Sequence, residues 1–212
     1  MAQPTGVTVT FSSVGLREDL ENVIYDISPT ETPFMSMGGR SDAIAVNHEW
    51  QTDSLAAAGD NFNEEGSTLT ATEAAATTRV GNICQISLKT SLISGTLDAV
   101  SKAGRKQELA YQMSKRAKEL KRDMERALVG VNIAKIPMAG DGTVRKLGSL
   151  PTWVNTNISK ASNGANGAGA GAAARTDGTQ RAFTETLLKA AIVTSYDSGA
   201  DIKYLMMAPS QK

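Results

Sequence analysis

Residues 101–129 read SKAGRKQELAYQMSKRAKELKRDMERALV, which is the longest regular pattern in this 212-residue chain. Apolar side chains recur in it three or four positions apart, at Leu109, Met113, Ala117, Leu120, Met124 and Leu128. This spacing places them along one face of an α-helix. The sequence therefore predicts a long amphipathic helix over 101–129, about 40 Å in length, with Gly130 as its C-cap.

The opposite face of this helix is basic, with Lys115, Arg116, Lys118, Lys121, Arg122 and Arg126. Residues 101–130 contain nine basic and four acidic side chains, a net charge of +5. Such a face could bind phosphate, but a helix face that contacts solvent or protein is the favoured interpretation. Because the apolar stripe is narrow, we expect the helix to pack on one side only.

Upstream of the helix, two segments alternate between apolar and polar residues, over 43–53 and 79–90. The alternation predicts two half-buried strands. Their expected inward faces carry Ile44, Val46, His48, Trp50 and Thr52 in the first, and Val80, Cys84, Ile86 and Leu88 in the second. About 25 residues with little to bury separate the strands, and loops of that length without structure are uncommon unless functional. We therefore expect a long hairpin whose tip projects onto a neighbouring molecule.

The hairpin segment is acidic, in contrast to the basic helix. Residues 42–78 include no Lys or Arg, and their acidic residues are Asp42, Glu49, Asp53, Asp60, Glu64, Glu65 and Glu73. The whole chain is neutral, with 22 basic and 22 acidic side chains, which argues against a protein that grips nucleic acid through a strong overall positive field. The acidic and basic segments are complementary, within a subunit or between copies. Two solvated surfaces without mutual contact are the alternative.

The remaining elements are shorter. Residues 1–15 are expected to form a polar arm with a β-like patch at 7–11, followed by an amphipathic helix over 16–27. Residues 161–178 are rich in Gly, Ala and Asn, which predicts a flexible loop without packed structure.

Towards the C-terminal end, a helix is predicted over 184–196, with Leu187, Leu188, Ala191 and Ile192 inward. A buried strand is expected at 202–208, before Pro209. A chain that ends beside a core strand suggests a partial protein, so we expect the 212 residues to be a truncated form.

The candidates for chemistry are few. His48 is the single histidine and Cys84 the single cysteine, both on expected apolar strand faces, so we interpret them as packed side chains and predict no metal site. Residues 167–172 formally match a dinucleotide fingerprint, but no strand precedes them. We expect no catalytic residues, no cofactor and no enzyme activity. Neither a membrane span nor a signal peptide is predicted.

Several strings resemble one protein family. They are ETPFM at 31–35, HEWQTDSL at 48–55, GT at 95–96, KAGRK at 102–106, ELAYQ at 108–112 and ELKRDME at 119–125. Together they closely resemble the SU10-type major capsid protein family of tailed bacteriophages, from about residue 31 to Ala208. The resemblance implies an α+β, HK97-like capsid fold that combines an N-terminal arm, an E-loop hairpin, a long spine helix in the P-domain, and an A-domain.

On this chain, the implied parts are the arm at 1–41, the E-loop at 42–92, the spine helix and P-domain at 93–136, and the start of the A-domain at 137–212. Copies of such a protein form hexamers and pentamers of an icosahedral shell in the virion, assembled in the host cytoplasm. The shell encloses double-stranded DNA without sequence-specific binding and has no membrane association. Portal, scaffolding and decoration proteins are possible further partners.

Two alternatives remain open at this point. One is a DNA-associated or scaffolding phage protein, and the other is an encapsulin-like compartment shell. For the capsid interpretation, we hypothesise that the acidic hairpin docks partly on the basic helix of a neighbouring subunit. The residues involved would be Glu49, Asp53, Asp60, Glu64 and Glu65 on one side, and Lys115, Lys118 and Arg122 on the other.

Overall fold

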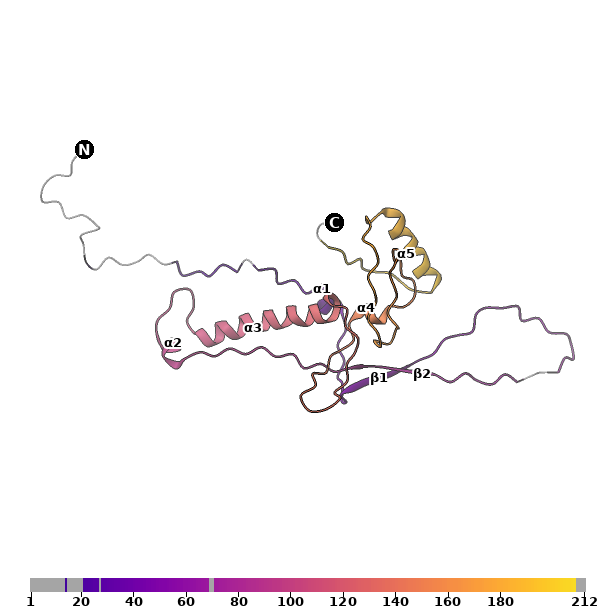
Figure 1. The fold of residues 1–212 in the computed structure, drawn as a ribbon, viewed down its shortest axis with the longest axis horizontal. Coiled ribbons are helices and arrows are strands. Elements are labelled where there is room, and N and C mark those ends of the chain that lie inside the picture. Colours follow the sequence, from indigo (N-terminus) through magenta and orange to yellow (C-terminus); the bar gives the residue numbers. More distant parts are fainter. Residues whose placement is uncertain (1–13, 15–20, 27, 69–70, 209–212) are drawn as a thin grey trace, which may run out of the picture. The chain divides into compact units, whose positions relative to one another are not determined.

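The computed structural model describes residues 14, 21–26, 28–68 and 71–208 (Figure 1). Helices and strands are both present, so the predicted mixed α+β content is confirmed. In chain order the elements are α1 (Pro33–Met37), β1 (Asn47–Thr52), β2 (Thr78–Ile83), α2 (Gly95–Ala99), α3 (Glu108–Glu125), the π-helical turn η2 (Arg126–Gly130), α4 (Leu150–Trp153) and α5 (Glu185–Asp197).

The chain divides into two compact units. The first unit comprises Met1–Glu31 and Lys89–Leu120, and the second comprises Thr32–Leu88 and Lys121–Lys212. Helix α3 therefore begins in the first unit, and its last residues belong to the second. Each unit has its own internal network of contacts.

The long helix predicted from the sequence is confirmed as α3, which is continued by the π-helical turn η2. It begins later than expected because residues 101–107 form turns, with Gly104 at φ +74°. The predicted C-cap at Gly130 is wrong, since Gly130 is the last residue of η2 and the extended Val131 is the cap. The N-terminal part of the apolar stripe is open to solvent, and Met113 is 61% exposed.

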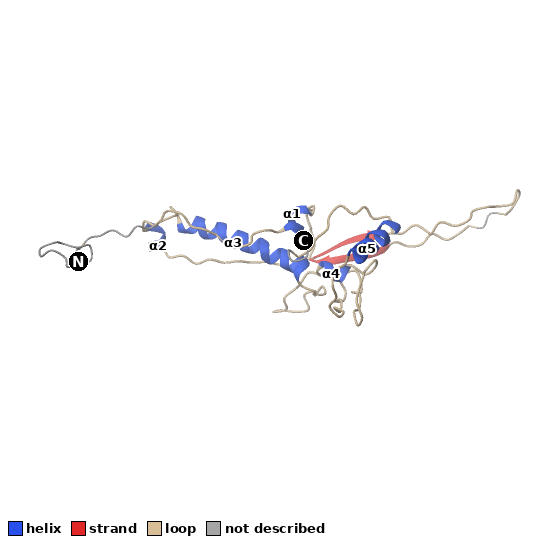
Figure 2. Cartoon of the chain, turned by 90° about the horizontal axis from the view of Figure 1, so that it is seen from above, coloured by secondary structure: helices blue, strands red, loops and turns tan. Residues whose placement is uncertain are grey.

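The predicted hairpin is confirmed, because β1 and β2 pair in antiparallel fashion with Trp50 opposite Val80. The expected half-burial is wrong for β1, which is exposed throughout. On β2 the buried residues are Gly81 and Ile83, whereas Ile86 and Leu88 are exposed, so the predicted inward face is also wrong. The reason is that, among the described residues, only those at the base of this two-stranded sheet pack against it. Beyond the strands, the chain continues in a long loop (Figures 1 and 2).

The Gly/Ala-rich segment 161–178 is packed, so the prediction of an unpacked loop is wrong. Its two limbs are joined by a bridge between Ala165 and Thr176, and Gly167 is buried. A Cβ atom added to Gly167 would lie 3.1 Å from the Cα of the fully buried Thr152. The small residues of this segment therefore allow two stretches of backbone to approach closely, and they do not make the segment a flexible loop.

Two other predictions differ from the structure. Residues 21–26 of the helix expected at 16–27 are irregular, and the rest of it, like the β-like patch at 7–11, lies outside the described residues. Residues 202–208 form no strand and are exposed, because the described part of the chain offers them no strand to pair with.

The predicted C-terminal helix is confirmed as α5. The Thr184 hydroxyl caps it by accepting a hydrogen bond from the backbone N–H of Leu187, and Gly199 follows its end at φ +80°. Leu187, Leu188 and Ala191 are half-buried as expected, but Ile192 is exposed.

Substitution of Gly171 tests the packing of the Gly/Ala-rich segment. Gly171 has φ +70°, and a Cβ there would lie 3.2 Å from the ring of Trp153. We expect Gly171→Ala to lower the free energy of unfolding by about 1–3 kcal/mol, through backbone strain and steric conflict. Urea unfolding of the purified protein measures this effect. Gly140→Ala is the control, because a Cβ at Gly140 meets nothing within 4 Å; equal stability of the two variants would contradict the prediction.

Candidate functional site

The start of α3 is held by a network within the first unit. The carboxylate of Asp98, in α2, accepts hydrogen bonds from the backbone N–H groups of Glu108 (2.8 Å) and Leu109 (3.4 Å). The Lys102 ammonium donates to the carbonyl oxygens of Leu97, Asp98 and Val100. Three of the family-like strings, at 95–96, 102–106 and 108–112, therefore contribute to or adjoin one local structure that sets where α3 begins.

Glu108 is the most buried charged residue of this network, at 3% exposed. Its carboxylate accepts a hydrogen bond from the Gln112 amide (2.9 Å) and pairs with Arg105. These two interactions, that of Gln112 foremost, lower the pKa of Glu108 below its ordinary value of 4.5 against the opposing effect of desolvation. The Arg105 guanidinium also lies 5.4 Å from the centre of the Tyr111 ring. The folded state thus favours the charged carboxylate.

The first unit is expected to lose stability on acidification. The pKa of Glu119 is lowered chiefly by a hydrogen bond from Arg116, and that of Asp26 chiefly by a backbone hydrogen bond from Ser28. Carboxylates with a lowered folded-state pKa stabilise the fold above their unfolded pKa, and that stabilisation is lost as the pH falls through the folded value. We therefore expect the free energy of unfolding to decrease as the pH is lowered beyond about 4.

Chemical unfolding at pH 6 and at pH 3.5 measures this dependence. Glu108→Gln should show a smaller loss between the two pH values than the unsubstituted protein, because one of the responsible carboxylates is gone. Glu185→Gln is the matched control, since Glu185 is an exposed carboxylate of α5. An unfolding free energy that rises on acidification would contradict the sign.

In the second unit, the end of α3 holds α1. The two carboxylate oxygens of Glu125 accept hydrogen bonds from the backbone N–H groups of Phe34 (2.8 Å) and Met35 (2.9 Å). These groups lie in the first turn of α1, where N–H groups have no partner within the helix. The strings at 31–35 and 119–125 thus meet through one side chain, which fixes the chain before the hairpin to the helix after it.

The base of the hairpin is held by an aromatic cluster. The rings of Trp50 and Trp153 are stacked, with centroids 5.2 Å apart and planes inclined by 26°. The indole N–H of Trp153 donates to the carbonyl of Gly148 (3.2 Å). The Lys135 ammonium lies 5.9 Å from the centre of the Trp153 ring and donates to the carbonyl of Gly81 (2.6 Å).

Asn82 adds a second attachment at the same place. The Asn82 side-chain NH₂ donates to the carbonyl of Gly148 (3.1 Å), and its side-chain oxygen accepts from the backbone N–H of Gly148 (2.8 Å). The hairpin is therefore fixed to residues 135–153 through Trp50 of β1 and through Gly81 and Asn82 of β2. The loop beyond the strands is not part of this attachment. Sequence reasoning missed the roles of Asn82, Trp153 and Glu125, since their partners lie far away in the chain.

The acidic residues of the predicted contact are exposed. Glu49 lies on β1 and forms an ion pair with Arg79 across the hairpin (3.3 Å), a partner the hypothesis did not consider. The others, Asp53, Asp60, Glu64 and Glu65, lie in the loop that follows β1. Most of the predicted acidic surface is thus available to another molecule.

The basic residues of the predicted contact, Lys115, Lys118 and Arg122, are exposed on α3. Lys118 lies 3.7 Å from the carboxylate of Asp26, and both side chains are at least half exposed. An exposed pair of this kind contributes only about 0–1 kcal/mol, so Lys118 can exchange partners at little cost. Arg116, on the same helix, pairs with Glu119 at 2.6 Å.

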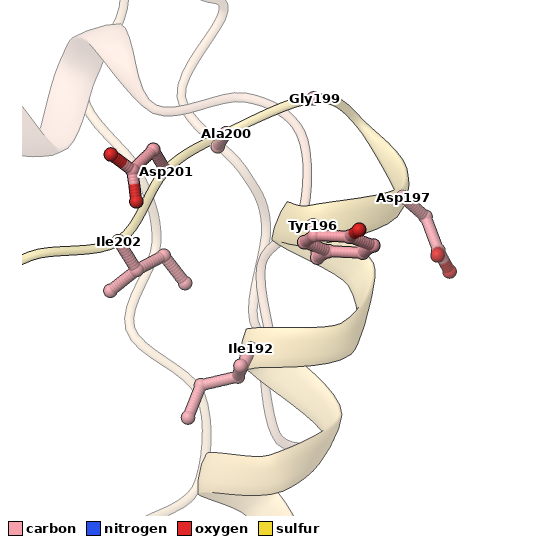
Figure 3. A pocket seen from close by; sticks show the side chains of 7 residues that line it. All are labelled: Ile192, Tyr196, Asp197, Gly199, Ala200, Asp201 and Ile202. Carbon is pink, nitrogen blue, oxygen red and sulfur yellow. The ribbon is translucent and has the colours of Figure 1, made fainter.

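The pocket at the end of α5 shows no arrangement of catalytic groups. This pocket is open (Figure 3) and is lined by Ile192, Tyr196, Asp197, Gly199, Ala200, Asp201 and Ile202. The carboxylates of Asp197 and Asp201 point apart in it, so they do not form an acid–base pair. Across the described residues, no group of three or more His, Cys, Asp or Glu side chains could hold a metal ion. No helix there is long and apolar enough to cross a membrane.

Comparison with known proteins places this geometry in context. The sequence model of the SU10 major capsid protein family matches residues 3–212. The chain is also 38% identical, over 130 residues, to the major capsid protein of Escherichia phage Phieco32. That similarity covers 61% of this chain and 37% of the relative, so the matched region spans little more than a third of the relative's length.

Proposed function

This chain belongs to the SU10 major capsid protein family, and from that premise we propose that it builds the head shell of a tailed bacteriophage. The observation that carries the proposal is the family match over residues 3–212. The role is structural, not enzymatic, and its site of action is the virion. The exposed hairpin supports the proposal, because a strand such as β1 that is exposed along its whole length suits a contact with another copy.

The finer assignment follows the implied HK97-like plan. Residues 1–41 would form the arm, 42–92 the E-loop, 93–136 the spine helix and P-domain, and 137–212 the beginning of the A-domain. Copies would associate into hexamers and pentamers that enclose double-stranded DNA without sequence-specific binding. Portal, scaffolding and decoration proteins are further proposed partners.

Electron microscopy of the purified full-length protein, after size-exclusion chromatography, tests the proposed function. Icosahedral particles, or rings of five and six subunits, are the expected result. A monodisperse monomer at every salt concentration and pH would contradict it. Salt-dependent DNA binding by such a monomer would instead favour a DNA-associated role, and particles with protein cargo would favour a compartment shell.

For the contact between copies, we propose that the acidic hairpin, which comprises β1 and the acidic loop that follows it from Asp53, lies partly on the basic face of α3 of a neighbour. Glu49, Asp53, Asp60, Glu64 and Glu65 would face Lys115, Lys118 and Arg122. Each exposed pair is worth only about 0–1 kcal/mol, but every subunit of a closed shell repeats it. Charge complementarity of this kind fixes orientation more than affinity.

Charge reversal tests this contact. We expect the double substitution Lys118→Glu and Arg122→Glu to reduce the yield of particles at low salt, because attraction becomes repulsion. Since salt screens both, added NaCl should oppose assembly of the unsubstituted protein and favour assembly of the variant. Light scattering between about 50 mM and 500 mM NaCl records both effects. The matched control reverses Lys189 and Lys203, which are exposed charges of the second unit. Unchanged assembly and salt dependence in the α3 variant would contradict the proposed contact.

A further inference from the structure

The acidic loop carries one large aromatic side chain, Phe62, which is 89% exposed. Asp60 precedes it by two residues and Glu64 follows it by two. In an extended chain, residues two positions apart share a face, so the ring would point in the same direction as two carboxylates. Single apolar side chains are common on protein surfaces, but an aromatic ring flanked by two carboxylates has the character of an interface anchor with a polar rim.

A groove of matching character lies beside α3, within the first unit. Its volume is about 240 Å³, and it is lined by Lys89, Ser91, Met113, Arg116, Ala117 and Leu120. The apolar members are spaced along one face of the helix, and Met113 is largely exposed. Two of the side chains that line it, Lys89 and Arg116, are basic. The groove therefore combines an apolar floor with positive surroundings.

We propose that Phe62 of one copy inserts into this groove of a second copy of the chain. The inference rests on the proposed function and adds an apolar anchor to the proposed charge contact. Asp60 and Glu64 then face the basic side chains around the groove, which selects the orientation in which the ring approaches. The ring and the groove floor lose water together, and this burial supplies affinity that exposed ion pairs do not.

Substitutions at Phe62 test the anchor in the full-length protein. We expect Phe62→Ala to raise the protein concentration at which shells first form by about tenfold or more, as at other aromatic anchors. Phe62→Leu should recover part of the loss, because it restores apolar volume. Thr68→Ala, in the same exposed loop, is the matched control and should assemble normally. Normal assembly of Phe62→Ala would overturn the inference and leave the proposed shell function intact.

A disulfide cross-link identifies the copy that supplies the groove. In a Cys84→Ser background, chains with Asn63→Cys are co-assembled with tagged chains that carry Ser91→Cys, and then oxidised with copper phenanthroline. A cross-link between the two kinds of chain, abolished by Phe62→Ala, is the expected result. Thr68→Cys, paired with the same Ser91→Cys chains, should cross-link less.

Two other outcomes would speak against the inference. When both cysteines are placed in one chain, a cross-link confined to single chains would assign the groove to the loop of the same molecule. Absence of any cross-link in well-formed shells would show that the loop lies elsewhere. If the unsubstituted protein forms no shells or rings at all, it is the proposed function that fails.

Discussion

Trp153→Ala is expected to lower the free energy of unfolding by about 2–4 kcal/mol. The indole is half-buried, stacks on Trp50, and donates a hydrogen bond to Gly148. Alanine removes all three contributions and leaves Lys135 without the ring beside it. Because this cluster attaches the hairpin, the variant should also assemble poorly even where it remains folded.

Urea unfolding and electron microscopy of the same samples separate the two effects of Trp153→Ala. Trp153→Phe is the informative control, since it keeps a stacking ring and loses only the indole N–H donor. It should fall between alanine and the unsubstituted protein in stability and should still form shells. Retention of full stability by Trp153→Ala would mean that Asn82 and Lys135 hold the hairpin without the aromatic pair.

Glu125→Ala is expected to release α1. Hydrogen bonds to a charged group contribute about 1.5–3 kcal/mol each, and this carboxylate accepts two, from Phe34 and Met35. A helix as short as the five residues of α1 cannot persist without such support. The expected total loss is about 2–4 kcal/mol, since the freed N–H groups regain water as α1 unravels.

Hydrogen exchange monitors the release of α1 directly. The amides of Phe34 and Met35 should exchange much faster in Glu125→Ala, while those in the middle of α3 remain protected. Glu125→Gln should act as a partial substitute, since it retains one acceptor oxygen. Glu185→Ala is the matched control, because the Glu185 side chain is 77% exposed and pairs with Lys189 four residues away on the same helix. Unchanged protection at Phe34 and Met35 would rule out the proposed support.

Local periodicity accounts for what could be predicted from the sequence. Helices α3 and α5 and the β1–β2 hairpin follow from spacings of three to four residues and of two residues, which are local signals. The buried face of β2 could not be predicted, because it depends on Lys135 and Gly148, which lie more than fifty residues away. The strand expected at 202–208 shows the same limit, since apolar residues indicate burial but do not name a partner.

The Gly/Ala-rich segment was misjudged for a different reason. Its composition is shared by flexible linkers and by loops that pack backbone against backbone. Only the positions of Thr152 and Trp153, which contact Gly167 and Gly171, distinguish the two cases. For the candidate site, the sequence pointed to the charges of the acidic loop and of α3. The sequence did not indicate that Glu49 pairs with Arg79 or that Lys118 pairs with Asp26. It also did not single out Phe62.

The scarcity of buried apolar side chains has a thermodynamic consequence. In the described part of the chain, Ile83 is the only hydrophobic side chain that is buried, and the other buried side chains larger than glycine are those of Glu108, Ser149 and Thr152. Unfolding a free subunit would therefore expose little new apolar surface, and its heat-capacity change should be small for 212 residues. Most of the heat-capacity change would instead accompany association. Calorimetry should accordingly find a shell whose formation becomes more favourable on warming, from subunits with shallow stability curves.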